Sequence, residues 1–365
     1  MNDAAPISLQ QAYADHSRHW RDFLYCYPVI SRRSKGLSIG INLNPDKACN
    51  FDCIYCQVDR KAPPSVRKVD LDVLRAELAH LLDAAALLDA PTHDASRRPA
   101  PTLPAPEGRR NVAPGVSPGF TTENTVKPRR GDRDSHARVN PASTMTAPPQ
   151  LAHDPPIVAW LFAETPFNAI LPDQRVVRDI AFSGDGEPTS YPRFDDAVSL
   201  VADLKRERRL DDTKIVLITD ACYLTKPHVA AGLRFMDENN GEIWAKLDAG
   251  TQGYYELVNR PNFPLAHVLS QILETAKIRP IVIQSLWMRV HSQPPPDEEV
   301  REFAKRLNEL LAAGAQFKLI QIYTVARQTT ETYATPLSRT ELDRVANIVT
   351  TAITVPIETY HGIES

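Results

Sequence analysis

The chain lacks several features that mark membrane, secreted and strongly basic proteins. None of its apolar runs reaches 18 residues, so we expect no membrane span. Residues 1–11 are polar and contain Asp3, without the basic and then apolar stretches of a secretory signal. The formal net charge is only −3 over 365 residues, so no overall basic field attracts nucleic acid. We therefore expect a cytoplasmic protein that does not associate with a membrane.

Cysteine is also scarce, with five residues in the whole chain. Thiols of a cytoplasmic protein are expected to stay reduced. Cys49, Cys53 and Cys56 nevertheless lie within eight positions of one another. Such close spacing indicates metal ligation or redox chemistry rather than disulfide formation.

Proline, by contrast, is abundant and unevenly placed. Of 31 prolines, 13 fall between Pro91 and Pro156, where the apolar pattern is weak and nine basic residues stand against six acidic ones. Such a segment cannot bury enough apolar surface to offset its chain entropy, so we predict a disordered insertion over 91–156. It is interpreted either as a tolerated loop or as a flexible basic arm that contacts an anionic partner.

Around this insertion, short apolar runs alternate with amphipathic stretches. The predicted strands are Leu37–Leu43, Val177–Phe182, Lys214–Thr219, Glu242–Leu247, Pro280–Trp287 and Phe317–Val325. The predicted helices are Val69–Leu88, Phe194–Lys205, Lys226–Met236, Leu265–Lys277, Asp297–Ala313 and Ser338–Thr350. This order predicts an α/β fold, a partial (β/α)6 parallel barrel whose ligands bind at the carboxyl ends of the strands. Its core spans 37–90 and 157–327, with an N-terminal extension over 1–36 and a C-terminal helical extension over 328–365.

The three close cysteines follow the first predicted core strand, with the spacing Cys-x3-Cys-x2-Cys. Thiolates on so short a loop can converge on three irons of one cubane and leave the fourth iron open. A closed iron or zinc site is the alternative, with Cys26 or Cys222 as the fourth ligand. Inert buried thiols are the third possibility.

The stretch Cys49-Asn50-Phe51-Asp52-Cys53-Ile54-Tyr55-Cys56 resembles the signature of the radical S-adenosylmethionine (SAM) superfamily. The resemblance implies that Cys49, Cys53 and Cys56 hold a [4Fe–4S] cluster and that SAM binds its open iron. It also implies reductive cleavage of SAM to a 5′-deoxyadenosyl radical that abstracts hydrogen from a substrate. An external electron donor such as flavodoxin or ferredoxin is then required.

Further polar residues follow the other predicted strands. The turn Gly184-Asp185-Gly186-Glu187-Pro188 is by itself a tight turn with a solvated acid, but it resembles the motif that binds the SAM amino group in that superfamily. Lys246 and Asp248 share one face of a strand, as a buried pair at the barrel mouth or as a surface pair, and Gln284 ends the next strand. The predicted cofactor-binding residues are Tyr55, Gly184, Asp185, Gly186, Glu187, Lys246, Asp248 and Gln284; no catalytic residue is assigned.

Several motifs together resemble one radical SAM subgroup, the proteins related to the wyosine-type tRNA synthases. They are Ser31-Arg32-Arg33, the cysteine loop, the turn at 184–189, Lys246–Thr251, Asn259-Arg260-Pro261 and Tyr323–Arg327. The basic stretch Ser31–Lys35 is either a solvated surface or a phosphate contact. Only Cys26 and Cys222 remain for a second cluster, so we expect one cluster. The substrate stays open, RNA or peptide; tRNA base modification and a non-catalytic iron–sulfur redox protein are the alternative functions.

Overall fold

The computed structural model describes residues 20, 22–64, 66–86 and 176–362. The predicted insertion over 91–156 lies outside the described residues. Within them, no helix is long and apolar enough to cross a membrane.

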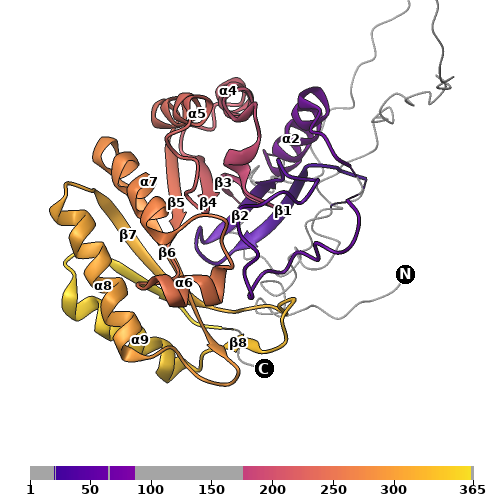
Figure 1. Ribbon diagram of the computed structural model, residues 1–365. Helices are drawn as coiled ribbons and strands as arrows, with labels where there is room; N and C mark the ends of the chain where they lie inside the picture. The colour runs from indigo at the N-terminus through magenta and orange to yellow at the C-terminus, as the bar shows by residue number, and fades with distance from the viewer. Residues whose placement is uncertain (1–19, 21, 65, 87–175, 363–365) are drawn as a thin grey trace, which may run out of the picture. The chain divides into compact units, whose positions relative to one another are not determined.

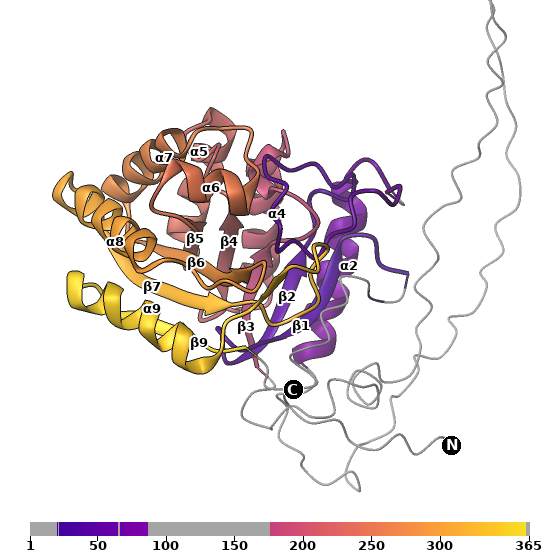
Figure 2. The same ribbon diagram turned by 60° about the horizontal axis from the view of Figure 1, so that its bottom comes forward.

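The described residues form one curved, mostly parallel sheet that is covered by helices on its outer face (Figures 1 and 2). The strand order is β1-β2-β3-β4-β5-β6-β7-β9, with β8 paired to β6. The strands are β1 Cys26–Ser31, β2 Gly36–Ile41, β3 Val177–Phe182, β4 Lys214–Thr219, β5 Gly241–Lys246, β6 Ile281–Val290, β7 Phe317–Thr324, β8 Ala334–Pro336 and β9 Ile357–Tyr360. From β2 to β9 every neighbour along the sheet is parallel, whereas β1 joins β2 antiparallel. The predicted partial parallel barrel is therefore confirmed.

The helices connect successive strands and begin where the sequence supplies suitable first turns. They are α2 Leu71–Ala86, α4 Phe194–Glu207, α5 Pro227–Glu238, α6 Gln252–Asn259, α7 Leu265–Ile278, α8 Asp297–Ala312 and α9 Arg339–Ala352. Three acidic residues open α8, where they favour the positive end of the helix dipole. Ser338 and Glu341 form a capping box that starts α9.

Alternation along the strands separates two apolar surfaces. Ile180, Ile215 and Ile243 face the helices and belong to the main core. The residue after each of them, Ala181, Val216 and Trp244, joins Val282 in a smaller cluster on the opposite face. Because strand residues alternate between faces, the next inward positions toward the carboxyl ends include Lys246 and Gln284. The inner face thus changes from apolar to polar as it reaches the mouth of the half-barrel.

Three strands and one helix were not predicted from the sequence. β1 contains Pro28, which removes a backbone donor and is tolerated because β1 is an edge strand. β8 and β9 have three and four residues, and α6 has eight, too few for a clear period. The described part of the expected helical extension over 328–365 contains α9 and also β8 and β9, of which β9 extends the parallel sheet.

Candidate active site

A cavity of about 270 Å³ lies at the carboxyl ends of the parallel strands. Its lining includes the three clustered cysteines and seven of the eight predicted cofactor-binding residues: Tyr55, Gly184, Asp185, Gly186, Glu187, Lys246 and Gln284. Asp248 does not line it but contacts Lys246 and Tyr55 directly behind the wall. The fold therefore brings the segments after β2 and β3 together with Lys246, which ends β5, as expected for a parallel sheet. Gln284 does not end its strand as expected but lies within β6, where it pairs with Lys246.

The cysteine loop is held on two sides by backbone hydrogen bonds. The amides of Asp52 and Ile54 donate to the carbonyls of Asn259 and Val258 at the end of α6. On the other side the Glu187 amide donates to the Ala48 carbonyl at 3.1 Å. The loop is consequently fixed in position by protein contacts alone.

Donors also surround two of the sulfur atoms. Asn259 Nδ2 lies 3.5 Å from Cys53 Sγ, while the Val58 amide and Arg60 Nη2 lie 3.4 and 3.8 Å from Cys56 Sγ. Hydrogen bonds to the sulfurs are one means by which proteins stabilise and tune iron–sulfur clusters. This donor set fits thiolates that carry metal.

Burial disfavours the thiolate form of two cysteines when no cation is present. It raises the pKa of Cys49 to about 12, with a further contribution from the Asp220 carboxylate. It raises the pKa of Cys53 to about 11, although the Lys246 ammonium opposes the shift. Both thiols need a positively charged partner to ionise at neutral pH, and iron provides one.

No cluster of three or more Cys, His, Asp or Glu side chains in the described ranges could hold a metal ion. Neither Cys26 nor Cys222, the two candidates for a fourth ligand, is among the described residues that line the cavity. Cys26 Sγ lies beside the Leu74 carbonyl under α2, and Cys222 Sγ beside the Asp220 carbonyl. A cubane differs from a site for a single metal ion because its three thiolates bind three separate irons. Three cysteines that line one cavity suit this arrangement.

The glycines of the turn after β3 permit close packing. A Cβ on Gly186 would lie 1.9 Å from the Ala48 carbonyl oxygen, immediately before Cys49. Gly184 has φ +152°, in the region that favours glycine, and its missing side chain leaves room for Asn42. Asn42 in turn donates to the Asp185 carboxylate at 2.8 Å. The turn therefore lies directly against the cysteine loop.

Glu187 is buried, and the interpretation of this residue as a solvated acid is wrong: its exposure is only 2%. Its Oε1 accepts from the Thr219 hydroxyl at 2.6 Å and from both the amide and the hydroxyl of Thr189. Its Oε2 accepts from the Asp220 amide at 2.7 Å. The carboxyl group thus fastens the end of β4 to the turn after β3.

A second carboxyl group, that of Asp220, lies beside Glu187. It accepts from Asn50 Nδ2 at 3.0 Å and from the Cys222 amide at 2.9 Å. Burial and the neighbouring Asp220 charge raise the pKa of Glu187 to about 8, and burial raises the pKa of Asp220 as well. Two acids that resist ionisation face the same cavity, so a cationic ligand there would favour their charged forms.

Lys246 and Asp248 form the predicted pair, with Nζ 3.6 Å from Oδ2. The Lys246 ammonium lies 4.4 Å from the centroid of the Tyr55 ring, and the Tyr55 hydroxyl donates to Asp248. Asn259 Nδ2 also donates to Asp248, at 3.0 Å. Burial is the largest single influence and lowers the pKa of Lys246, but the Asp248 carboxylate, together with Tyr323 and Cys53, raises it overall. Asp248 is buried and Lys246 is partly buried, and both contact Tyr55 of the cysteine loop.

Gln284 is fully buried and lines the cavity. Its Nε2 donates to Gln321 Oε1 at 2.8 Å, but its Oε1 has no hydrogen-bond partner among the described residues. An unpaired buried acceptor is costly, so a donor from a bound ligand fits this position.

Three residues of the site had no assigned role from the sequence. Asn259 appears only as part of the motif Asn259-Arg260-Pro261, and Asp220 and Arg60 are given no role. Arg60 Nη1 donates to the Asp185 carbonyl at 3.1 Å and so links the cysteine loop to the turn after β3. No spacing rule points to Arg60, and Asn259 gives no local signal either, because the eight-residue helix α6 that it ends has no clear period.

Comparison with family models gives no match, and no curated protein matches the chain. Among solved structures, it is similar to SuiB from Streptococcus suis bound to S-adenosylmethionine, with 10% identity, a TM-score of 0.47, and coverage of 90% of this chain and 52% of that one. It is also similar to a domain of pyruvate-formate lyase-activating enzyme from Bacteroides vulgatus (14% identity, TM-score 0.37, coverage 50% and 98%). Archaeal TYW1 is a third (12% identity, TM-score 0.31, coverage 53% and 56%).

The chain spans about half the length of the SuiB chains that it matches. Identities and TM-scores this low describe a partial likeness of chain path, so a functional assignment rests on the residues of this chain.

Proposed function

We propose that this protein is a radical SAM enzyme that binds a [4Fe–4S] cluster through Cys49, Cys53 and Cys56 and binds SAM in the adjoining cavity. One observation carries the proposal. The three cysteines, the glycine–glutamate turn and the Lys246–Asp248 pair come together at one cavity at the strand ends. A protein that only carries a cluster needs the cysteines but not the rest of this cavity.

When bound, the cluster and SAM supply reductive cleavage of a carbon–sulfur bond and a radical that abstracts hydrogen. The chain's own part is to bind and orient. Glu187 and Asp220 face the cationic end of SAM, since both are buried acids on the cavity wall. Gln284 Oε1 accepts a hydrogen bond from the ligand, which satisfies an otherwise unpaired acceptor.

Polar and charged contacts hold the part of the cavity wall that contains Tyr55. Tyr55 is fixed by Asp248, Asn259 and Lys246, so the loop segment between Cys53 and Cys56 keeps its position. Asp248 Oδ1 accepts from the Leu286 amide at 2.8 Å, which joins this wall to β6. Such preorganisation places the reacting groups without a further conformational cost.

The reducing electron comes from an external donor such as flavodoxin or ferredoxin in this proposal. The cytoplasm is the proposed location, because all five cysteines are free and a reducing compartment keeps them so. The substrate is RNA or peptide. Modification of a tRNA base is the more specific candidate, favoured by the arginine-lined pocket beside the cavity.

The decisive experiment is anaerobic reconstitution with iron and sulfide, followed by addition of SAM and dithionite. We expect about four irons per chain, because three thiolates and one open iron make a [4Fe–4S] site, and formation of 5′-deoxyadenosine. The Asp203→Asn variant serves as a matched control, since Asp203 is an exposed partner of Arg206 away from the cavity. A cluster that forms and changes its redox state, but never cleaves SAM, would support the non-catalytic redox protein instead.

A further inference from the structure

A second pocket, of about 110 Å³, adjoins the cavity. Its lining shares six residues with that of the cavity: Arg33, Tyr55, Gln57, Leu286, Tyr323 and Arg327. The other lining residues come from β1 and the turn after it, from the end of β7 and the segment after it, and from β9. β1 and β9 are the two ends of the sheet. Arg32 Nη1 donates to the His361 carbonyl at 2.8 Å and links these ends. The pocket is thus formed where the half-barrel's first and last strands approach each other.

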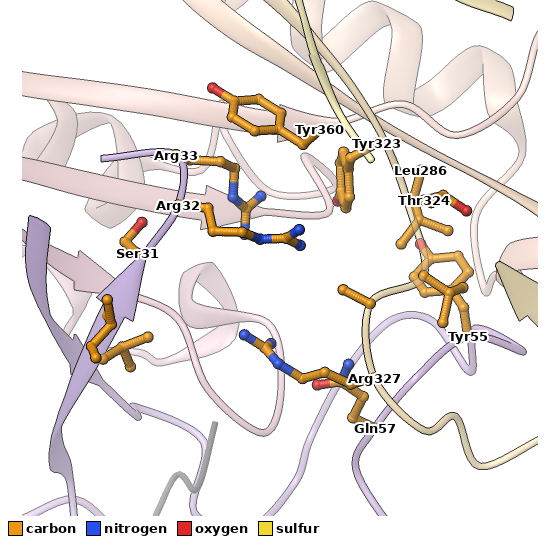
Figure 3. Close-up of a pocket in the computed structure, with 14 residues that line it drawn as sticks. Ser31, Arg32, Arg33, Tyr55, Gln57, Leu286, Tyr323, Thr324, Arg327 and Tyr360 are labelled. Atoms are coloured by element: carbon orange, nitrogen blue, oxygen red, sulfur yellow. The ribbon is translucent and has the colours of Figure 1, made fainter. Parts of the chain in front are cut away.

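Three guanidinium groups enter this pocket. Figure 3 shows Arg32 and Arg33 reaching in from one side and Arg327 extending toward them from the other. Among the described residues that line the pocket there is no Asp or Glu. Like charges held this close repel one another, so the arrangement is complementary to an anion.

Two acids lie near the arginines but outside the lining. The Arg33 charge opposes the rise in the pKa of the buried Asp179, so part of that charge is already balanced. Glu358 accepts from the hydroxyl of Tyr360, a residue that lines the pocket. Neither Asp179 nor Glu358 is among the described residues that line the pocket.

Aromatic contacts hold one guanidinium in place. The Arg33 guanidinium lies 5.2 Å from the Tyr323 ring centroid and 5.3 Å from that of Trp244. Contact with the two rings orients the planar Arg33 guanidinium, so that its N–H groups can donate two parallel hydrogen bonds to an oxyanion.

We propose that this arginine pocket binds a phosphate group of the substrate and thereby places the attached carbon skeleton in the adjoining cavity. The proposal rests on the proposed function for the identity of the cavity, and it narrows the substrate class to phosphate esters. A phosphate suits the pocket because it brings up to two negative charges and three acceptor oxygens to three guanidinium groups. Nucleotides and sugar phosphates share this chemistry.

The test is calorimetric titration of the cluster-loaded protein at saturating SAM, so that SAM already occupies its own part of the cavity. The probes are ribose 5-phosphate with ribose as its partner, and uridine 5′-monophosphate with uridine. We expect each phosphate ester to bind at least about tenfold more tightly than its unphosphorylated partner. Tighter binding of the nucleotide than of the sugar phosphate would identify nucleotides as the source; equal binding would identify the phosphate alone.

Arg33→Gln and Arg327→Gln should each weaken binding of ribose 5-phosphate by roughly tenfold or more. Arg301→Gln removes the same charge from an exposed ion pair on α8 and should leave binding unchanged. If a variant fails to fold, displacement of ribose 5-phosphate by inorganic phosphate in the unaltered protein gives an independent measurement. Equal affinity for ester and partner, or no displacement, would overturn the proposal.

The two proposals fail separately. Absence of SAM cleavage by a protein that still prefers phosphate esters would reject the enzyme function but not the phosphate site. Normal SAM cleavage with no preference for phosphate would reject the arginine pocket alone.

Discussion

Replacing Glu187 with alanine removes an acceptor that four donors share, namely the Thr189 amide and hydroxyl, the Thr219 hydroxyl and the Asp220 amide. The Thr219 and Asp220 donors are buried, and each costs roughly 1–3 kcal/mol when it loses its acceptor. We therefore expect Glu187→Ala to lower the free energy of unfolding by roughly 2–6 kcal/mol. Urea denaturation of the cluster-free protein, monitored by circular dichroism, measures this loss.

Ionisation of Glu187 adds a dependence on pH. Because the pKa of this carboxyl group rises from 4.5 in the unfolded chain to about 8 in the fold, the folded state holds its proton more tightly. Its contribution to stability is complete below pH 4.5 and is lost as the pH rises through 8. The slope reaches about 1.4 kcal/mol per pH unit, so roughly 2–3 kcal/mol disappears between pH 5.5 and 7.5.

The isosteric variant Glu187→Gln separates the two effects. It keeps one acceptor oxygen, so it should destabilise less than Glu187→Ala at pH 5.5, and it should flatten the loss of stability toward pH 7.5. Glu298→Gln on α8 is the control, since that side chain is exposed. Identical pH slopes for the unaltered protein and Glu187→Gln would refute the argument that a buried carboxyl group is forced to ionise beside Asp220.

Three further predictions concern the cluster and its surroundings. We expect the cluster to be lost in each of the variants Cys49→Ala, Cys53→Ala and Cys56→Ala, and to be kept in Cys26→Ala and Cys222→Ala. The iron content of the reconstituted variants measures this. Loss of iron from Cys26→Ala would contradict a cluster with an open iron. Gly186→Ala should lower both stability and iron loading because its Cβ meets the Ala48 carbonyl, whereas Gly253→Ala, with no atom within 4 Å, should leave both unchanged or slightly raise stability. Asp248→Asn breaks a buried pair and should lower the free energy of unfolding by roughly 3–5 kcal/mol in urea denaturation, against less than about 0.5 kcal/mol for the exposed Asp203→Asn. Equal losses in the last two variants would show that Lys246 does not need its partner.

The six predicted core strands all form, and their order along the sheet follows their order along the chain. Parallel strands are buried on both faces, so each appears as a short apolar run that sequence alone identifies. β1 and β9 escaped prediction because they lie at the edges, where proline and half-exposed residues weaken the apolar pattern. Lys246 and Asp248 could be predicted near the cysteine loop because parallel strands end at one side of a sheet. Gln284 lies within β6 and reaches the site because it pairs with Lys246.

The sequence by itself determined the cysteine loop and the turn at 184–188, since each is a local arrangement of a few residues whose spacing carries its geometry. Only the tertiary structure decided what surrounds them. Asn259 reaches Cys53 across 206 positions, and Glu187 reaches Asp220 across 33, because the fold brings the ends of distant strands and α6 to one cavity. Whether Glu187 is a solvated or a buried acid depends on that packing, and so does the pKa of its carboxyl group. The arginine pocket likewise exists only because curvature of the sheet carries β9 back toward β1, an effect that no local pattern encodes.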